Sequence, residues 1–329
     1  MDRKKLTDKV KGCLLGGLIG DAMGAPVENW NYWDIEEKYG EISDFEGSGT
    51  DDSAVKLILC EALIHNKGHI TADEFAEHFL KNPQFYDLFF VPVRNMYHKL
   101  QNETDLPVHA GINNTASSSS VMSISPMGIV NACDPRTAAR EAYAVAGLIH
   151  SCSTSFCRDA ASGMAAAVAE AVSPNSTVDS VLKAAVDYLH PKSAKLMKEL
   201  ILDALQMARD AGEYQKFREI YYQKCLYPTI CDSRETVPAT FALFYLADGD
   251  ASKCIIYGAN FGRDSDTIAS MLGALAGAYQ GISGLRTEWV EKVLKNNPQQ
   301  EELAQNMEAL VWSRYEEKRN LLTVLDSMR

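Results

Sequence analysis

Several common signatures are missing from this sequence. Its eight cysteines include no Cys-x-x-Cys pair, which argues against a zinc ribbon or a thioredoxin-type redox motif. No apolar run approaches the roughly 18 residues that a membrane span needs. The longest one near the N-terminus, residues 13–19, is short and contains glycine, and Asp21 ends it. We therefore interpret it as a core helix and not as a targeting segment.

Basic residues are also scarce. The chain has 32 Lys and Arg against 44 Asp and Glu, a formal net charge of −12. This balance argues against nonspecific binding to nucleic acid or to an anionic membrane surface, so we expect neither as a partner. Cysteines such as Cys60 lie inside apolar helical patterns. We expect buried free thiols and a reducing, cytoplasmic location.

Strand patterns are nearly absent. No run of β-branched or aromatic residues stands between turn signals, and residues 85–93, which contain Pro92, read as a loop or short helix. Helical periodicity dominates instead, and Thr71 with Glu74 forms a capping-box pattern. The patterns predict helices after Thr71 and over 136–149, 158–172, 178–189, 193–211, 235–247, 251–257 and 307–325. We predict an all-α fold: a compact single-domain orthogonal helix bundle over residues 1–329, with a core at about 10–284 and C-terminal helices 285–329 packing on it.

Small residues are concentrated in three predicted helices, over residues 12–24, 160–171 and 269–281. Small side chains allow two helices to approach closely. Packing alone explains most of these glycines and alanines. Close packing would also bring segments that are distant in the sequence together.

Two acidic clusters lie more than 200 positions apart, and both read as helix openings. Thr50, Asp51 and Asp52 form the first; Asp264, Asp266 and Thr267 form the second. Their carboxylates and hydroxyls are hard oxygen ligands of the kind that Mg²⁺, Mn²⁺ or Ca²⁺ prefers. Each cluster alone is equally explained as a helix N-terminus, where Thr caps and Asp favours the dipole. An EF-hand is excluded, because its sixth and twelfth positions would be Ala269 and Leu275.

A third segment favours the metal site over the interpretation as two helix N-termini. Residues 20–28 read Gly-Asp-Ala-Met-Gly-Ala-Pro-Val-Glu. Together with Gly-Thr-Asp-Asp-Ser at 49–53 and Gly-Arg-Asp-Ser-Asp-Thr at 262–267, this segment resembles the ADP-ribosylglycohydrolase family, whose three motifs occur here in order. The resemblance runs from about residue 10 to 284.

The resemblance implies a dinuclear metal cleft. Two divalent cations, Mg²⁺ or Mn²⁺, would be held by ligands from both clusters: Thr50, Asp51, Asp52, Asp264, Asp266 and Thr267. It also implies that Glu28, Asp51 and Asp266 take part in catalysis, with Glu28 as general base or substrate orienter. Without the motif, Glu28 would be read as a loop carboxylate in an ion pair. Asp21 is placed at the substrate site, and securing the loop through backbone hydrogen bonds is its simplest role.

A serine-rich segment occupies the position of the family's substrate loop. Ser118, Ser119, Ser120 and Met122 are the candidate substrate contacts there, against the simpler interpretation of a flexible loop. The family carries Asn-Gly and Met-Arg where this chain has Ser118-Ser119 and Met122-Ser123, which weakens the case for diphosphate recognition. His150 falls where the family often has Thr-His, although a histidine at a helix end is more often a capping residue.

The resemblance implies an enzyme: a metal-dependent glycosidase that cleaves an N- or O-glycosidic bond to ribose and releases ADP-ribose from a modified protein or small molecule. The altered loop raises the alternative of a nucleoside or riboside hydrolase. A non-catalytic ADP-ribose-binding protein is disfavoured because Glu28 and every expected ligand are present. A purely structural helical scaffold would leave the three motifs unexplained.

Overall fold

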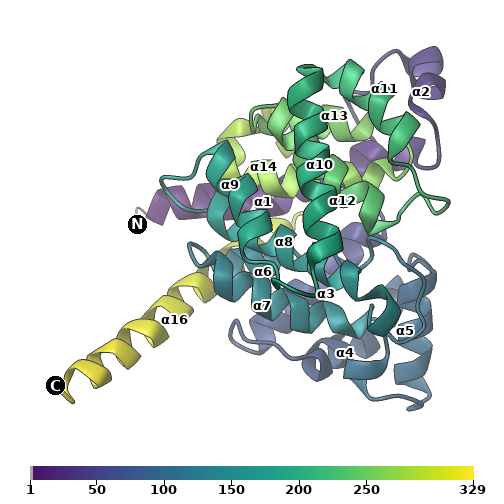
Figure 1. Ribbon diagram of the computed structural model, residues 1–329. Helices are drawn as coiled ribbons and strands as arrows, with labels where there is room; N and C mark the ends of the chain where they lie inside the picture. Colours follow the sequence, from purple (N-terminus) through teal and green to yellow (C-terminus); the bar gives the residue numbers. More distant parts are fainter. Residues whose placement is uncertain (1–2) are drawn as a thin grey trace.

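The computed structural model describes residues 3–329, and these residues form an all-helical molecule (Figure 1). The α-helices are α1 (Arg3–Gly24), α2 (Tyr32–Tyr39), α3 (Asp51–His65), α4 (Ala72–Lys81), α5 (Val91–Gln101), α6 (Ser125–Val130), α7 (Pro135–Val145), α8 (Ser155–Ala171), α9 (Val178–Asp187), α10 (Lys195–Ala211), α11 (Tyr214–Lys224), α12 (Ser233–Leu246), α13 (Ala251–Ala259), α14 (Ser265–Gln280), α15 (Thr287–Asn296) and α16 (Gln300–Asp326). Short 3₁₀ turns connect several of them. Within 3–329 no strand forms, and a single isolated bridge joins Asn31 to Gly262. The all-α prediction is confirmed.

Helices α1 and α14 form the centre of the molecule, side by side and antiparallel (Figure 1). Their backbones touch: a Cβ added at Gly16 would lie 2.2 Å from the carbonyl oxygen of Gly273, and one at Gly12 would lie 2.3 Å from that of Gly277. Every residue of α14 from Ser265 to Ala278 is buried. The small-residue stretches therefore serve close helix packing, as expected.

This central pair positions the three motifs. Because α1 and α14 are antiparallel, the C-terminal end of α1 lies beside the N-terminal end of α14. Gly24, for example, approaches the backbone of Ser265 and Asp266. The first turn of α3 joins the same end through hydrogen bonds from Thr50 and Ser53 to Asp21. The segments around 21–28, 50–53 and 262–267 therefore meet at one end of the central pair.

The helix signals in the sequence agree with the structure in most places. Thr71 and Glu74 form the capping box that opens α4, and Thr177 caps α9. Residues 85–93 were predicted as a loop or short helix; they include the connection before α5 and its first turn, where Pro92 is tolerated because its missing N–H needs no intrahelical partner. Helices α2, α6 and α11 were not predicted, whereas α15 falls within the predicted C-terminal helices.

Cysteine burial follows the prediction only in part. Cys13, Cys60, Cys157 and Cys254 are buried free thiols, whereas Cys133 and Cys152 are exposed. Both exposed cysteines have a positive φ, 65° and 57°, so they lie in turns between helices and not on the buried faces of helices.

The C-terminal helix has two distinct parts. Through Arg314, α16 packs on the body with buried residues such as Met307 and Val311. From 315 to 329 every residue is exposed, and this half of the helix extends away from the body (Figure 1). The expectation that all of 285–329 packs on the core is therefore wrong for residues 319–329, whereas Glu317 and Lys318 still pair with His69 and Asp134. Among the described helices, none is long and apolar enough to cross a membrane.

Candidate metal centre and substrate cavity

Asp21, the last carboxylate of α1, anchors the first turn of α3. It is fully buried and accepts hydrogen bonds from the backbone N–H groups of Thr50 and Ser53, at 3.0 Å each, and from the Ser53 hydroxyl at 2.5 Å. These bonds satisfy N–H groups that a helix N-terminus leaves without an intrahelical partner. Asp21 thus positions the acidic turn and does not line the substrate cavity described below.

The N-terminal turns of α3 and α14 are cross-linked by two hydrogen bonds. The Thr50 hydroxyl donates to Oδ2 of Asp266 at 3.3 Å, and the Thr267 hydroxyl donates to Oδ2 of Asp52 at 3.1 Å. Each helix therefore contributes one threonine and one aspartate to the contact. This reciprocal arrangement holds two acidic helix openings close to each other.

The Glu28 segment is fixed beside the turn that precedes α14. The Asn29 N–H donates to the carbonyl of Arg263 at 2.8 Å, and the Arg263 N–H donates to the carbonyl of Trp30 at 2.6 Å. Gly262 and Arg263 both have positive φ, which the tight turn requires. The Arg263 side chain forms an ion pair with Glu235 at 2.8 Å, so its charge is already partnered.

The result is a tight group of carboxylates with unpaired oxygens. One oxygen each from Glu28, Asp264 and Asp266 lies within 4.8 Å of the others. Oδ1 of Asp52, Oδ2 of Asp264 and Oδ1 of Asp266 are buried and have no hydrogen-bond partner. Buried polar atoms without partners are rare in native proteins and call for a ligand or ion. The donor set, all hard oxygen, fits a divalent cation.

The acidity of these groups reflects the same crowding. Burial is the largest cause that raises the pKa values of Asp52, Asp264 and Asp266 well above that of a free aspartate, and repulsion between neighbouring carboxylates adds to it. Burial also raises the pKa of Asp51 to about 6, although the Phe90 N–H bond at 3.1 Å opposes this shift. The pKa of Glu28 is raised by burial and by Asp21. A bound cation would remove this repulsion.

A cavity of about 450 Å³ opens beside the carboxylates. Of the candidate residues, Glu28, Asp51, Asp52, Ser118, Ser119, Met122, Asp264, Asp266 and Thr267 line it. Thr50, Asp21, Ser120 and His150 do not. Its other walls are Asn29, Phe90 and the loop 228–231, which sequence reasoning missed because they carry no recognisable motif. None of the described lining residues is Lys, Arg or His.

The serine-rich segment is a buried, hydrogen-bonded loop. The Ser118 hydroxyl donates to the carbonyl of Cys231 at 2.8 Å and pairs with the Thr236 hydroxyl at 2.6 Å. Ser118 and Ser119 are at most 3% exposed. The simpler interpretation of a flexible loop is therefore wrong. The segment forms a fixed wall that also holds the 228–231 loop.

His150 lies behind this wall. It is completely buried; Nδ1 pairs with the Ser120 hydroxyl at 2.9 Å, and Nε2 lies 3.2 Å from both the Ser117 hydroxyl and the Thr115 carbonyl. Burial lowers the pKa of His150 to about 4, so the ring is neutral at pH 7. His150 and Ser120 therefore support the loop from behind and do not line the cavity.

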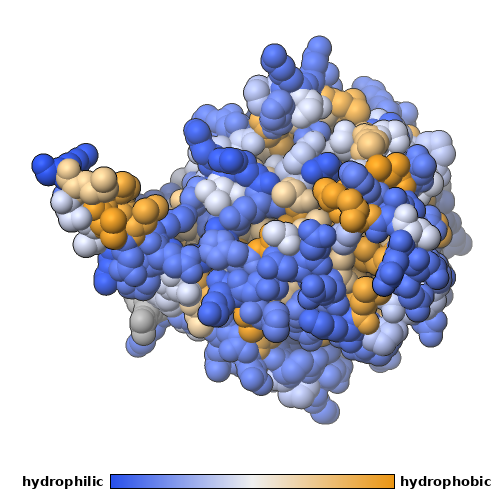
Figure 2. Space-filling view, turned by 90° about the horizontal axis from the view of Figure 1, so that it is seen from below, coloured by the Kyte–Doolittle hydropathy of each residue, from blue (hydrophilic) through white to orange (hydrophobic). Residues whose placement is uncertain are grey.

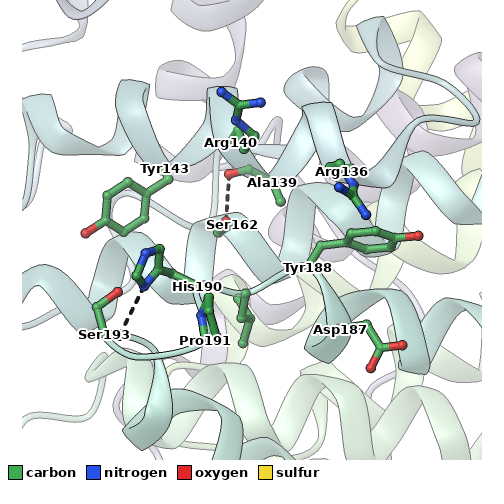
Figure 3. A pocket seen from close by; sticks show the side chains of 11 residues that line it. Arg136, Ala139, Arg140, Tyr143, Ser162, Asp187, Tyr188, His190, Pro191 and Ser193 are labelled. Atoms are coloured by element: carbon green, nitrogen blue, oxygen red, sulfur yellow. Dashed lines mark hydrogen bonds between the residues drawn. The ribbon is translucent and has the colours of Figure 1, made fainter.

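A larger cavity, of about 790 Å³, lies between α7, α8 and the connection from α9 to α10. Figure 3 shows its arginines, Arg136 and Arg140, and its two tyrosine rings. The acidic side chain in its lining is Asp187, which pairs with Lys183. Size alone does not make this cavity the reaction site, because it lacks the grouped carboxylates with unpaired oxygens. It shares no lining residue with the acidic cavity.

Comparisons with known proteins agree with the geometry. The ADP-ribosylglycohydrolase family profile matches residues 2–320. The Escherichia coli (strain K12) protein YegU is 27% identical over 307 residues, covering 85% of this chain and 90% of its own. The human ADP-ribosylhydrolase ARH3 is 24% identical (85% and 88% covered), and the Pseudomonas putida ADP-ribosylarginine hydrolase Tri1 is 24% identical (87% and 74% covered).

The fold has a close counterpart as well. A solved ADP-ribosylglycohydrolase-related protein complex superposes with a TM-score of 0.69 at 22% identity, covering 94% of this chain and 99% of that one. The family match over residues 2–320 includes all three acidic segments. On the family match over residues 2–320, the chain belongs to the ADP-ribosylglycohydrolase family of hydrolases.

Proposed function

We propose that this protein is a divalent-metal-dependent hydrolase that cleaves the glycosidic bond at C1 of a ribose, releasing ADP-ribose from a modified protein side chain or small molecule. The observation that carries the proposal is the carboxylate group of Glu28, Asp264 and Asp266 at the wall of a 450 Å³ cavity, with buried oxygens that have no partner. The names of relatives such as ARH3 and Tri1 support an ADP-ribosyl substrate.

The metal ligands in this proposal are Thr50, Asp51, Asp52, Asp264, Asp266 and Thr267. Two ions, Mg²⁺ or Mn²⁺, suit this all-oxygen set. When bound, they would supply Lewis acidity toward water and orient the vicinal ribose hydroxyls. The Thr50 and Thr267 hydroxyls now donate to Asp266 and Asp52, so they would have to turn their lone pairs to the ions.

Glu28 is the proposed general base. Its carboxylate is exposed at the cavity and lies within reach of the buried pair Asp264 and Asp266. Hydrolysis at ribose C1 passes through a transition state with oxocarbenium character, so a negative carboxylate on one face both stabilises the sugar and accepts the proton of the attacking water. The raised pKa of Glu28 strengthens it as a base near neutral pH.

We propose that Asp51 and Asp266 contribute to catalysis by positioning the ribose of the substrate. Asp51 is held by the Phe90 N–H at 3.1 Å, and Phe90 itself lines the cavity. This bond fixes the Asp51 carboxylate against one wall while Asp266 is fixed through Thr50. The two groups thereby set where a ribose would lie relative to Glu28.

A second candidate is hydrolysis of a nucleoside or simple riboside on the same site. The absence of Lys, Arg and His from the described lining favours it, because a diphosphate in a water-poor cavity is normally met by cations. Neutral donors remain in the lining, among them backbone N–H groups and the side chains of Ser119, Thr229 and Asn29.

A hydrolysis screen tests both candidates. The metal-stripped protein is assayed with EDTA, Mg²⁺ or Mn²⁺ on ADP-ribosyl-arginine, ADP-ribosyl-serine, O-acetyl-ADP-ribose and free nucleosides, with products separated by chromatography. We expect metal-dependent release of ADP-ribose. The Glu28→Gln variant should lose this activity, and the control variant Glu37→Gln, which replaces an exposed glutamate of α2, should retain it. Release of free base from nucleosides at higher kcat/KM would select the second candidate. Failure on every substrate with either metal would reject both.

A further inference from the structure

The outer end of α16, residues 319–329, continues beyond the last ion pairs of this helix with the body, which join Glu317 to His69 and Lys318 to Asp134. Every residue from 315 to 329 is exposed, yet the segment is helical to Asp326. An isolated helix of this length is marginal in water, since most helical stability in proteins comes from packing an apolar face. A surface that covers this segment would explain its helicity.

The exposed face carries a long apolar stripe. Figure 2 shows the projecting end with much of its visible surface apolar. Its apolar residues, with exposed fractions of 50–78%, are Tyr315, Leu321, Leu322, Leu325 and Met328. Their spacings of three, four and seven place them on one side of the helix, as in a coiled-coil seam. Val324, which is 58% exposed, lies beside Leu321 and Met328 at the edge of the stripe, whereas the exposed Thr323 lies on the opposite side.

We infer that this stripe is a self-association surface, on which the projecting half of α16 pairs antiparallel with the same segment of a second copy of this chain. A two-fold axis between Leu322 and Thr323 brings the leucines of both copies together. In this register the seam positions are Tyr315, Leu322 and Leu325, with Leu321 and Met328 widening it on one side.

The charges along the segment are complementary to themselves in this register. Arg319 of one copy faces Asp326 of the other. Within one copy these residues form only exposed pairs, Arg319 with Glu316 at 2.9 Å and Arg329 with Asp326 at 3.7 Å. Such pairs contribute little and can exchange partners. Charged residues flanking a seam set the choice and direction of the partner helix.

The base of the helix offers a place for the tip of the second copy. The same register brings Met328 of one copy opposite Glu317 of the other, next to a cavity of about 290 Å³. Trp312, Tyr315, Lys318 and Cys133 line this cavity. A methionine is well suited to fill an irregular gap between aromatic rings. The interface therefore continues from the stripe to the body.

The expected dimer is weak. If each of the five apolar side chains buries on the order of 100 Å², two copies bury roughly 1,000 Å², just below the ~1,200–2,000 Å² of standard stable interfaces. We therefore expect a concentration-dependent dimer. A membrane is a poorer occupant, because the chain carries a net charge of −12 and the three basic residues of the segment are balanced by Glu316, Glu317 and Asp326.

Sedimentation velocity on the full chain tests this inference without reference to activity. We expect the average mass to rise from 36.3 kDa toward twice that value between about 1 and 200 μM, a range that brackets a micromolar dissociation constant. Leu325→Glu should keep the protein monomeric across that range. Thr323→Glu, which places the same charge on the opposite face of the helix, should leave the dimer intact. Circular dichroism checks that each variant keeps its fold.

A charge exchange tests the antiparallel register. Arg319→Glu places a carboxylate opposite Asp326 at both ends of the pair, and Asp326→Arg places a second guanidinium opposite Arg319, so each variant alone should dimerise about 10-fold more weakly. An equimolar mixture of the two variants pairs opposite charges again at these positions and should dimerise better than either variant alone.

Three results would overturn the inference. The first is a wild type that stays monomeric up to about 200 μM, where a micromolar dimer would be nearly complete. The second is a mixture that dimerises no better than its components. The third is a monomeric wild type that co-sediments with phosphatidylcholine–phosphatidylserine vesicles through Leu325, which would assign the stripe to a lipid surface instead.

Discussion

Replacing Asp266 with asparagine should stabilise the metal-free protein and destroy its response to metal. The side chain is 3% exposed, one of its oxygens has no partner, and it lies within 4.8 Å of Asp264 and Glu28 oxygens. In most proteins the loss of a buried, hydrogen-bonded carboxylate is destabilising. Here the neighbouring carboxylates repel Asp266, so we expect its replacement to raise the unfolding free energy of the metal-free protein.

The magnitude follows from the geometry of the Asp264–Asp266 pair. Two unit charges 4.8 Å apart repel by about 3.5 kcal/mol at an effective dielectric constant of about 20. The helix dipole and the Thr50 hydrogen bond favour the charged Asp266 by about 1 kcal/mol in total, and partial protonation reduces the repulsion further. A net gain of about 2 kcal/mol in unfolding free energy remains for Asp266→Asn, equal to roughly 3 °C in Tm for 329 residues.

Differential scanning calorimetry in EDTA and in excess Mg²⁺ measures this prediction. In EDTA we expect Asp266→Asn to melt about 3 °C above the wild type; at 100 times the dissociation constant, Mg²⁺ should add about 2.7 kcal/mol to the wild type and far less to the variant. Asp179→Asn, an exposed aspartate in the first turn of α9, is the matched control and should lose at most about 0.5 kcal/mol in both buffers. Two results together would refute the reasoning: a wild-type Tm that does not change with divalent metal, and an Asp266→Asn variant that melts below the wild type in EDTA.

Four further predictions concern other parts of the molecule. Glu28→Gln should lower kcat by about 10²–10⁴ while metal still raises Tm, because a general base is lost and most ligands remain; an unchanged kcat would exclude Glu28 as the base. Metal affinity measured by calorimetric titration should rise from pH 6 to pH 8, because the raised pKa values of Asp51, Asp52, Asp264 and Asp266 let protons compete with the ion; a flat profile would contradict those pKa values. Gly16→Ala should cost about 3 kcal/mol or more in urea unfolding, since its Cβ would lie 2.2 Å from a backbone oxygen; a loss below about 1 kcal/mol would show that α1 and α14 can separate. His150 has a pKa of about 4 in the folded protein against about 6.5 in the unfolded chain, so the neutral ring stabilises the fold above pH 6.5 by up to about 3 kcal/mol, and this stability is lost as the pH falls through 4. The free energy of unfolding of His150→Gln should therefore fall less than that of the wild type between pH 7 and pH 4.5. Parallel plots of unfolding free energy against pH for the two proteins would reject this assignment.

The acidic residues could be located from the sequence because their patterns are local. A carboxylate at a helix opening, a turn glycine before it and a small-residue helix after it are all readable over a few positions. The structure brings Asp51 and Asp264 to one cavity because α1 and α14 are antiparallel and in backbone contact. The opposing walls had no such signal: Phe90 and residues 228–231 reach the cavity through tertiary packing alone.

His150 and Ser120 are the converse case, because the sequence indicated them as site residues but they do not line the cavity. Their residue types and family positions suggested substrate contact, but the direction of a side chain at a helix end depends on what packs around it. Both side chains point to each other at 2.9 Å behind the loop. A buried polar residue in a motif position can thus hold the wall of a site without facing its ligand.

Helix α11 was missed for a related reason. Its inner face consists of Tyr214, Phe217 and Tyr221, but Arg218 lies among them and interrupts the apolar pattern. In the structure Arg218 is 3% exposed and satisfied by the carbonyl of Asn260 at 2.8 Å and by an ion pair with Glu36. Sequence periodicity cannot identify a buried arginine whose partners come from distant segments.

The contact between α1 and α14 links the stability of the fold to the geometry of the site. Asp21 at the end of α1 holds the α3 turn, and Gly24 approaches the backbone of Asp266 at the start of α14. Any displacement of α1 along α14 therefore changes the separation of Asp51 and Asp52 from Asp264 and Asp266. An ion tolerates only small changes in the distances between its ligands. We therefore expect substitutions at the glycines between α1 and α14 to lower the affinity of the proposed site for a divalent cation as well as the stability of the fold.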